Sequence, residues 1–456
     1  MAKLTQVYAC SNCGAQFPKW QGRCTECGQW GTVAFEAAPR KRISRAQAGS
    51  VVTLDTDSRG LGADHRIPSG MLEWDRVLGG GIVPGSLILL GGDPGIGKST
   101  LALQLAAQLS SNQNVLYVSG EESAEQVGLR LKRLQVKQKK LAFLAETDLD
   151  VVLATLEETK PQLAVIDSVQ TLATDDVPSE AGSVPQVRTA TVRLLDVAKA
   201  NRIALVLVGH VTKEGAMAGP KALEHLVDVV LYLEGDRYHA FRILRGVKNR
   251  FGSTNEVGVF DMRNDGLREV ANPSEVFLAE RQTGPGSAVT SVVEGSRAFL
   301  VEIQALVNPT VFGMPRRTTS GLDINRLQLL LAVLQKRAGL KLGTHDVYVN
   351  VVGGFRVTEP AADLAAALAI ASIVSGQAIP GKLVAIGEVG LGGEVRSVSN
   401  LERRLKEAKQ LGFTEVVLSN QGKVEAPAGV QVLRVGTVKD AINEVLGRVV
   451  ERENGS

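Results

Sequence analysis

A glycine-rich stretch next to an apolar run places the strongest constraint on how this chain folds. Residues Gly92–Ser99 fit the pattern of a glycine, four residues and then Gly-Lys-Ser. An apolar run, Leu87–Leu90, precedes the stretch, and a helical pattern, Leu101–Leu109, follows it. A chance glycine-rich turn would not need this strand–loop–helix context, so the sequence predicts a phosphate-binding loop.

Each part of this loop has a predicted role in binding ATP. Glycines let successive backbone N–H groups face phosphate oxygens, and the helix N-terminus adds partial positive charge. We predict that Lys98 reaches the β- and γ-phosphates and that the Ser99 hydroxyl binds Mg²⁺. The predicted ATP-binding residues are Gly92, Asp93, Pro94, Gly95, Ile96, Gly97, Lys98, Ser99 and Thr100.

Carboxylates follow two further strand-like runs. Asp167 ends the run LAVID, and we predict that it holds Mg²⁺ or a water of its shell, although an aspartate at a strand end is also a common turn former. Glu121 and Glu122 follow the run VLYVSG. We expect Glu121 to act as the base that activates the attacking water, with Glu122 as its possible substitute. A helix N-terminus that favours acids is the alternative explanation.

The order of apolar runs predicts an α/β protein. Strand-like runs alternate with helical stretches after the glycine-rich loop, which implies a mostly parallel sheet. From Val227 the runs VVLYLEG, AFRILRGVK and EVGVFDM are typical of antiparallel strands added to that sheet. We predict four segments: a four-cysteine module (1–36), a polar linker (37–65), an ATPase domain (66–270) and a second α/β domain (271–456).

All four cysteines lie near the N-terminus as two Cys-x-x-Cys pairs. Four thiolates suit a tetrahedral Zn²⁺ without an open position, so we predict a structural zinc site formed by Cys10, Cys13, Cys24 and Cys27. Lys19, Trp20, Arg23 and Trp30 lie around these pairs and could stack on bases or contact a protein partner. The sequence leaves these two roles open.

The charge distribution and the N-terminus bear on location. Residues 1–50 contain seven Lys or Arg and two Glu, whereas the whole chain has a formal net charge of +3. This basic segment indicates either contact with a polyanion or a solvated linker. The first residues lack a secretory signal, and the longest apolar stretch, Leu364–Val374, is shorter than a membrane span. We therefore expect a cytoplasmic protein without a membrane partner.

These motifs together resemble a known family. The loop, the GEES element at 120–123, the late antiparallel strands and Lys248–Gly252 (KNRFG) are similar to those of the bacterial RadA family, also called Sms. The resemblance extends over essentially the whole chain and implies a RecA-like ATPase between the zinc module and a C-terminal domain similar to that of Lon proteases. It also implies a homo-hexamer that translocates on single-stranded DNA, drives branch migration of branched DNA in recombination and repair, and works with a RecA-type recombinase.

The resemblance suggests roles for further cations. KNRFG is predicted at a hairpin tip, where Lys248 or Arg250 would reach the nucleotide of the adjacent subunit as an arginine finger does. Polar loops at 174–188 and 210–222 would face the centre of a ring, with Arg188, Lys213 and Lys221 as candidate DNA contacts; ordinary surface loops are the alternative. His210 is a candidate nucleotide sensor or a structural histidine.

The C-terminal domain lacks the residues of a Lon-type peptidase. Ala361 occupies the position of the serine nucleophile and Glu402 that of the lysine base. We therefore expect a non-proteolytic domain that assembles the ring and offers duplex DNA a basic surface. The residues predicted for that surface are Arg396, Arg403, Arg404 and Lys406. An ATP-dependent protease and a nucleotide-switched scaffold remain the alternative functions.

Overall fold

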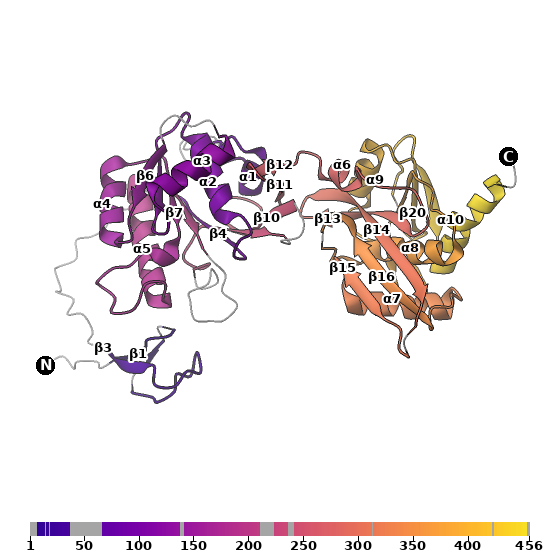
Figure 1. Ribbon diagram of the computed structural model, residues 1–456, viewed down its shortest axis with the longest axis horizontal. Helices are drawn as coiled ribbons and strands as arrows, with labels where there is room; N and C mark the ends of the chain where they lie inside the picture. Colours follow the sequence, from indigo (N-terminus) through magenta and orange to yellow (C-terminus); the bar gives the residue numbers. More distant parts are fainter. Residues whose placement is uncertain are drawn as a thin grey trace, which may run out of the picture. The chain divides into compact units, whose positions relative to one another are not determined.

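We analysed a computed structural model of the chain (Figure 1). It describes residues 7–36 except 14 and 18, and residues 66–453 except 137–140, 210–222, 236–240, 312, 355 and 422–423. The contacts divide the chain into two compact units: the second contains Val270–Ser456 with two short segments, 235–242 and 255–261, and the first contains the rest.

The N-terminal module is a small antiparallel sheet in the order β2-β1-β3. Its strands are β1 (Val7–Cys10), β2 (Gln16–Phe17) and β3 (Val33–Glu36). Among the described residues of the module, Cys10, Phe17, Cys24 and Val33 form the buried apolar cluster. A core of this size is too small to hold a fold alone, which agrees with a module that depends on metal.

The central domain is built on a nine-stranded sheet in the order β12-β11-β10-β9-β4-β8-β7-β5-β6. Its strands are β4 (Leu87–Gly92), β5 (Val115–Ser119), β6 (Leu141–Ala145), β7 (Leu163–Asp167), β8 (Ala204–Val208), β9 (Val229–Glu234), β10 (Phe241–Asn249), β11 (Val257–Arg263) and β12 (Gly266–Glu269). Strands β4 to β9 pair in parallel. The prediction that the strands from Val227 are antiparallel is therefore wrong for β9, which pairs in parallel with β4; β10 is antiparallel to β9.

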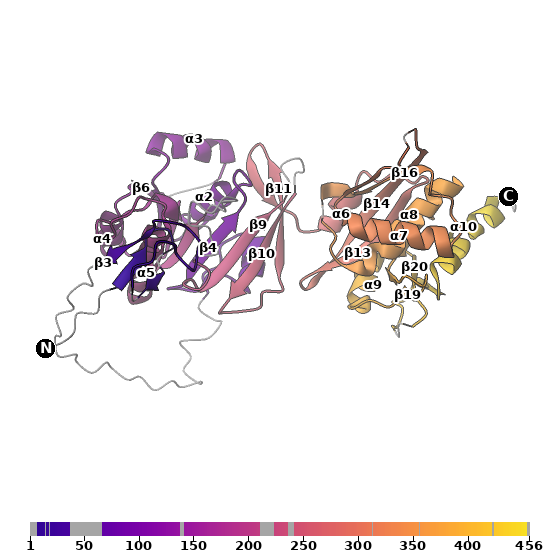
Figure 2. The same ribbon diagram turned by 90° about the horizontal axis from the view of Figure 1, so that it is seen from below.

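Helices cover both faces of this sheet. They are α1 (Leu72–Leu78), α2 (Lys98–Leu109), α3 (Ala124–Leu134), α4 (Leu149–Thr159) and α5 (Val184–Asn201), with a short 3₁₀ turn at Val169–Thr171. Helices α4 and α5 pack on one face through an apolar cluster that includes Leu89, Leu156 and Leu194. Helices α2 and α3 lie on the other face (Figures 1 and 2). Strands β4, β5, β7 and β8 are continuously buried, as strands covered on both faces must be, whereas the edge strand β6 is partly exposed.

The C-terminal domain contains a mixed seven-stranded sheet in the order β15-β16-β14-β13-β17-β20-β21. Its strands are β13 (Ser287–Glu294), β14 (Arg297–Pro309), β15 (Arg317–Ser320), β16 (His345–Val351), β17 (Leu383–Ala385), β20 (Glu415–Ser419) and β21 (Gln431–Val435), beside the small hairpin of β18 (Glu388–Val389) and β19 (Val395–Arg396). Its helices are α6 (Pro273–Leu278), α7 (Ile324–Arg337), α8 (Asp363–Ser375), α9 (Leu401–Gln410) and α10 (Val438–Glu453). Helix α8 is buried over ten consecutive residues, 363–372, between the sheet and its neighbours. Within the described ranges, no helix has the length and hydropathy that crossing a bilayer requires.

Candidate ATP and zinc sites

The glycine-rich loop lies between β4 and α2, as its sequence context predicts. Its three glycines, Gly92, Gly95 and Gly97, all have positive φ, so none can be replaced without strain. Gly92 has a φ of 149°, and a Cβ there would approach the backbone oxygen of Leu233 to 2.5 Å. Gly97 has a φ of 112° and is the N-terminal cap of α2. The loop is therefore held close to the sheet, with the positive end of α2 beside the predicted phosphate position.

Lys98 is the cation of this loop. Its side chain is almost fully buried, and its Nζ donates to the backbone oxygens of Gly92 (2.9 Å) and Asp93 (3.0 Å). Burial lowers the pKa of the Lys98 ammonium to about 8, and the charges of Asp167, Asp93 and Glu121 partly oppose this shift. A lysine that bonds only to loop carbonyls is placed to exchange them for phosphate oxygens.

Ser99 and Asp167 come together from α2 and the end of β7. Ser99 Oγ donates to Asp167 Oδ1 at 3.0 Å, which is the pairing expected of two residues that share a Mg²⁺ site. Burial raises the pKa of the Asp167 carboxyl, while hydrogen bonds from Tyr117 and Ser99 act in the opposite direction. Hydroxyl and carboxylate oxygens are ligands that suit Mg²⁺.

Tyr117 is a residue of this site that the sequence analysis missed. Its hydroxyl donates to Asp167 Oδ2 at 2.6 Å, and its ring is fully buried within β5. In the parallel register Tyr117 lies opposite Val165 and Ser119 lies opposite Asp167, so the side chains of Tyr117 and Asp167 share one face of the sheet. Tyr117 therefore fixes the orientation of the Asp167 carboxylate.

The two glutamates after β5 have different partners. Both backbone N–H groups donate to Ser119 Oγ, which shapes the turn. Glu121 Oε1 accepts from Ser168 Oγ at 2.8 Å, next to Asp167. Glu122 instead forms an ion pair with Arg130 of α3. The carboxylate of Glu122 is thus already neutralised by a cation, whereas Glu121 faces the end of β7.

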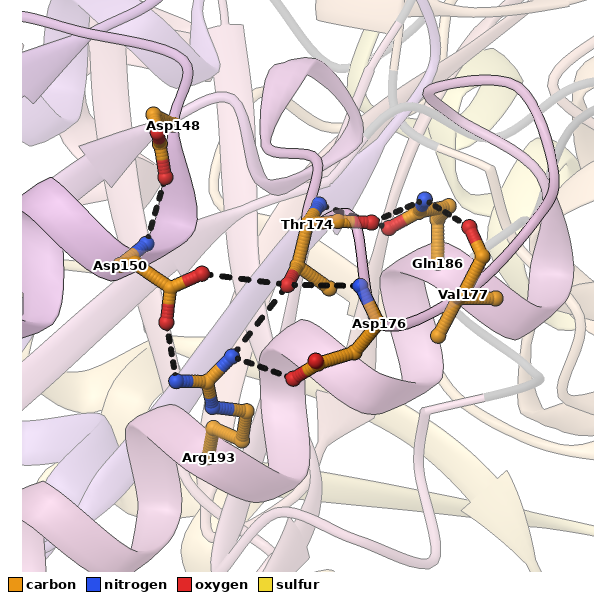
Figure 3. Close-up of polar contacts among 7 residues, drawn as sticks. All are labelled: Asp148, Asp150, Thr174, Asp176, Val177, Gln186 and Arg193. Carbon is orange, nitrogen blue, oxygen red and sulfur yellow. Dashed lines mark hydrogen bonds and ion pairs between the residues drawn. The ribbon is translucent and has the colours of Figure 1, made fainter. Parts of the chain in front are cut away.

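The first predicted DNA loop is held in one shape by a polar network (Figure 3). Gln186 is buried at the start of α5, and its Nε2 donates to the backbone oxygens of Thr174, Val177 and Ser179 at 2.8–3.0 Å. Its Oε1 accepts from the backbone N–H of Thr174. Arg193 pairs with both Asp150 and Asp176. The segment between Thr174 and Ser179 is thus an ordered loop anchored on α5.

The structure corrects the predicted position of one candidate DNA contact in a loop. Arg188 does not lie in a loop, because α5 begins at Val184; its exposed side chain projects from the first turns of that helix. His210, Lys213 and Lys221 lie outside the described residues.

KNRFG is only partly a turn. Strand β10 continues through Asn249, so Lys248 lies within the strand and not at the hairpin tip as predicted. Its Nζ donates to the backbone oxygens of Glu224 (2.7 Å) and Val227 (2.8 Å). Arg250 follows the strand and pairs with the buried carboxylate of Asp228 at 3.0 Å. Both cations therefore have partners within this chain.

The four cysteines form a cluster whose geometry fits zinc. Their Sγ atoms all lie within 4.8 Å of one another, with Cys10 and Cys27 separated by 3.7 Å and Cys13 and Cys24 by 3.5 Å. Tetrahedral coordination with Zn–S near 2.3 Å places two sulfurs about 3.8 Å apart. The four thiols thus surround a space of the right size for one Zn²⁺. They would fill all four coordination positions and leave none open for water or substrate, which indicates a structural site.

We expect one Zn²⁺ to co-purify with each chain. Replacing Cys13 or Cys24 with serine should release it, because three thiolates hold zinc less well than four and the module has almost no core of its own. Metal analysis of protein purified under reducing conditions measures this. As a control, the central domain of these variants should melt at the wild-type temperature, because residues 37–65 separate it in sequence from the cysteine module. Freshly reduced protein without zinc would contradict the assignment.

The region that corresponds to a Lon dyad contains no nucleophile and base. Ala361 is buried and carries no hydroxyl, and Glu402 is exposed on α9. Ser372 of α8 is a serine that a shifted dyad would need as nucleophile, but it is buried, accepts from the backbone N–H of Gly286 and donates to the carbonyl of Gln377.

One of the four residues predicted for the basic surface of this domain does not lie on the surface. Arg404 is fully buried; it pairs with Glu359 and donates to the backbone oxygens of Ser291 and Ser399. A buried guanidinium needs such partners because its desolvation is costly. Arg403 and Lys406 are exposed on α9, and Arg396 is exposed on β19.

Comparison with known proteins identifies the family. A protein named DNA repair protein RadA from Bacillus subtilis is 49% identical over 457 residues, which cover 98% of this chain and 100% of the relative. Relatives of the same name from Streptococcus pyogenes and Listeria monocytogenes are 50% and 48% identical, each over 98% of this chain and at least 99% of their own length. The chain belongs to the RadA family. The predicted resemblance is confirmed.

Matches to individual domains agree with the RadA architecture. Residues 8–34 match a rubredoxin metal binding domain, residues 62–216 an AAA domain, and residues 306–422 subunit ChlI of Mg-chelatase. A solved structure of the RadB recombinase aligns with 44% of the chain at 21% identity and a TM-score of 0.36. The predicted fold class is confirmed: a zinc ribbon, an ATPase domain with a mostly parallel sheet, and a Lon-like α/β domain.

Proposed function

We propose that this protein is a DNA-dependent ATPase and helicase that moves along single-stranded DNA and drives branch migration in homologous recombination and repair. The observation that carries the proposal is the convergence of Lys98, Ser99, Asp167 and Glu121 at one end of the sheet, in a chain about half identical to RadA proteins over nearly its whole length. Because the proposed motor acts on DNA, we assign this protein to the cytoplasm.

The ATP site divides the chemistry among its residues. Lys98 binds the β- and γ-phosphates, and Ser99 and Asp167 hold the Mg²⁺ that accompanies ATP. Glu121 orients and deprotonates the attacking water, a role supported by its hydrogen bond with Ser168, the neighbour of Asp167, and by the pairing of Glu122 with Arg130. Tyr117 keeps the Asp167 carboxylate turned toward Ser99.

DNA contacts and oligomer assembly complete the proposal. Arg188, Lys213 and Lys221 bind phosphates of single-stranded DNA. The protein assembles as a homo-hexamer in which Lys248 and Arg250 serve the neighbour's ATP, and it acts together with a RecA-type recombinase. Residues 1–36 are the zinc module, 37–65 the linker, 66–270 the motor and 271–456 a domain without peptidase activity.

Two alternatives make different predictions. An ATP-dependent protease needs a nucleophile that Ala361 cannot supply, and the hydrogen bonds of Ser372 argue against a shifted dyad. A nucleotide-switched scaffold would bind ATP without translocation. ATP turnover with and without single-stranded DNA, followed by unwinding of forked DNA with and without a recombinase filament, separates all three. Turnover that single-stranded DNA leaves unchanged, together with no unwinding, would reject the motor.

The choice between the two glutamates can be tested directly. Glu121→Gln should retain ATP binding and lower turnover by about 10²- to 10⁴-fold, because the base is lost while the shape is kept. Glu122→Gln should have a much smaller effect, since its carboxylate is paired with Arg130. Binding of a fluorescent ATP analogue and single-turnover hydrolysis measure the two steps separately. The assignment is wrong if Glu122→Gln is the slower enzyme.

A further inference from the structure

The zinc module exposes two large aromatic side chains. Trp20 is 62% exposed and Trp30 is 73% exposed, whereas Trp74, the third tryptophan of the chain, is completely buried in the central domain. Neither exposed indole belongs to the buried cluster of the module, which consists of Cys10, Phe17, Cys24 and Val33. The cost of keeping two indoles in water indicates a ligand that covers them.

The two indoles lie beside the same glycine. A Cβ built on Gly22 would contact Trp20 Cη2 at 3.7 Å and Trp30 Cζ3 at 3.8 Å, so both rings lie close to the same point of the backbone. The backbone fixes this arrangement, because Gly31 N–H donates to the Gly22 carbonyl at 2.8 Å and Arg23 forms a β-bridge with Trp30. The rings are therefore carried by a knuckle that the zinc site itself holds in shape.

A cation completes this surface. The Arg23 guanidinium lies 5.8 Å from the centre of the Trp30 ring, in cation–π contact, and its Nε donates to the carbonyl of Gly28. Lys19 precedes Trp20 and is exposed. Beyond the module, residues 37–50 contain four Arg or Lys and no acid. Two flat apolar faces beside several cations match the chemistry of stacked bases joined by phosphates.

We propose that Trp20, Trp30 and Arg23 form a stacking platform for single-stranded nucleic acid. The indoles stack on two bases, and Arg23 and Lys19 contact the adjoining phosphates. Stacking needs no base-specific hydrogen bond, so the platform is tolerant of sequence, as a motor on DNA requires. The inference rests on the proposed function, and adds to it a DNA contact in the zinc module in addition to those of the ATPase domain.

The surroundings of the rings favour nucleic acid over a protein partner. A protein hot spot is normally an aromatic anchor within an apolar patch that a partner can dehydrate. Here the chain between the rings is polar or glycine apart from its cysteines, and includes Gln21, Thr25, Glu26 and Gln29. Isolated rings among polar groups suit planar bases better than a closely packed protein surface.

Tryptophan fluorescence of the full-length protein tests the platform. Titration with oligothymidylate should quench the emission of the two exposed indoles, while the emission of Trp74 stays unchanged. Each ring that is removed should weaken binding of the oligonucleotide about 5- to 150-fold, the range expected for loss of one stacked base. Trp30→Leu should show this loss, and Trp30→Phe should recover part of it, because phenylalanine restores a π-face and leucine restores only apolar volume. Retention of one zinc per chain shows that the variants are folded.

The outcomes separate this inference from the proposed function. Turnover stimulated by single-stranded DNA without any quenching, or equal affinities for Trp30→Leu and wild type, would overturn the platform and leave the motor intact. A loss of affinity for fluorescently labelled oligothymidylate in the double variant Trp20→Leu/Trp30→Leu would support the platform even if DNA had no effect on turnover. If a recombinase filament, and not oligothymidylate, shields the indoles from acrylamide, the surface binds protein and the inference is wrong.

Discussion

Replacing Lys98 with alanine should lower ATP turnover by about 10³-fold or more. The ammonium is the only cation that the described part of the loop, 92–100, contains, and it lies within hydrogen-bond distance of the Gly92 and Asp93 carbonyls. Loss of one preorganised charge at a developing anion typically costs 10²–10³ in rate, and this charge also contributes to binding ATP. Steady-state phosphate release in the presence of saturating single-stranded DNA measures the effect.

Two controls separate chemistry from folding in this experiment. Lys98→Met retains the apolar stem of the buried side chain and removes only the charge. It should therefore be as inactive as Lys98→Ala, but its melting temperature should be closer to that of the wild type. Lys132→Ala removes a lysine from the exposed surface of α3 and should leave turnover unchanged. Turnover by Lys98→Met above a tenth of the wild-type rate would show that the loop does not act through this ammonium.

Local pattern was sufficient to predict the phosphate loop with the strand before it and the helix after it. The helices predicted near 323–338, 361–375 and 400–410 are α7, α8 and α9. Apolar residues recur with helical periodicity in α7 and α9, whereas α8 is a continuous apolar, alanine-rich run that is buried on all sides over residues 363–372. The strand order could not be read from the sequence. The direction of β9 depends on its crossover from β8, so the apolar run alone did not distinguish parallel from antiparallel.

Contacts between distant residues explain what the sequence analysis missed. Tyr117 meets Asp167 only because β5 and β7 are neighbours, although 50 positions separate them. The burial of Arg404 was indicated locally, because Arg404 has the i, i+3, i+4, i+7 spacing of one buried helix face together with Leu401, Leu405 and Ala408. Its partner, Glu359, lies 45 residues away in another element, so the compensation for a buried guanidinium was not visible in the sequence.

We expect Arg250→Ala to lower turnover about 10³-fold or more while binding of ATP persists. In the proposed hexamer this guanidinium stabilises charge on the γ-phosphate held by the adjacent subunit, as an arginine finger does. Lys248→Ala should have an effect of the same kind. In the structure of one chain Arg250 is 51% exposed and pairs with Asp228, which also accepts from the backbone N–H of Leu87. The exposed part of the side chain leaves it free to approach a second subunit.

The ion pair with Asp228 offers a competing explanation that a matched variant removes. Arg250→Ala leaves a buried carboxylate without its cation, which by itself destabilises the fold. Asp228→Asn breaks the same ion pair, keeps an acceptor for Leu87 and leaves Arg250 in place. If Arg250 acts on the neighbour's ATP, Asp228→Asn should retain most turnover; if its role is structural, both variants should lose stability and activity together. Thermal melting and ATP turnover of the two variants distinguish these cases.

Mixing inactive subunits locates the finger. Arg250→Ala and Glu121→Gln proteins should each be nearly inactive alone, because one lacks the finger at every interface and the other lacks the base in every site. Mixed rings contain some interfaces at which an intact finger from a Glu121→Gln subunit meets an intact base in an Arg250→Ala subunit. Partial recovery of turnover upon mixing is therefore expected, and its dependence on the mixing ratio should follow the fraction of such interfaces. If cross-linking shows mixed oligomers but no ratio restores turnover, Arg250 acts within its own subunit, and hydrolysis does not depend on an adjacent chain in this way.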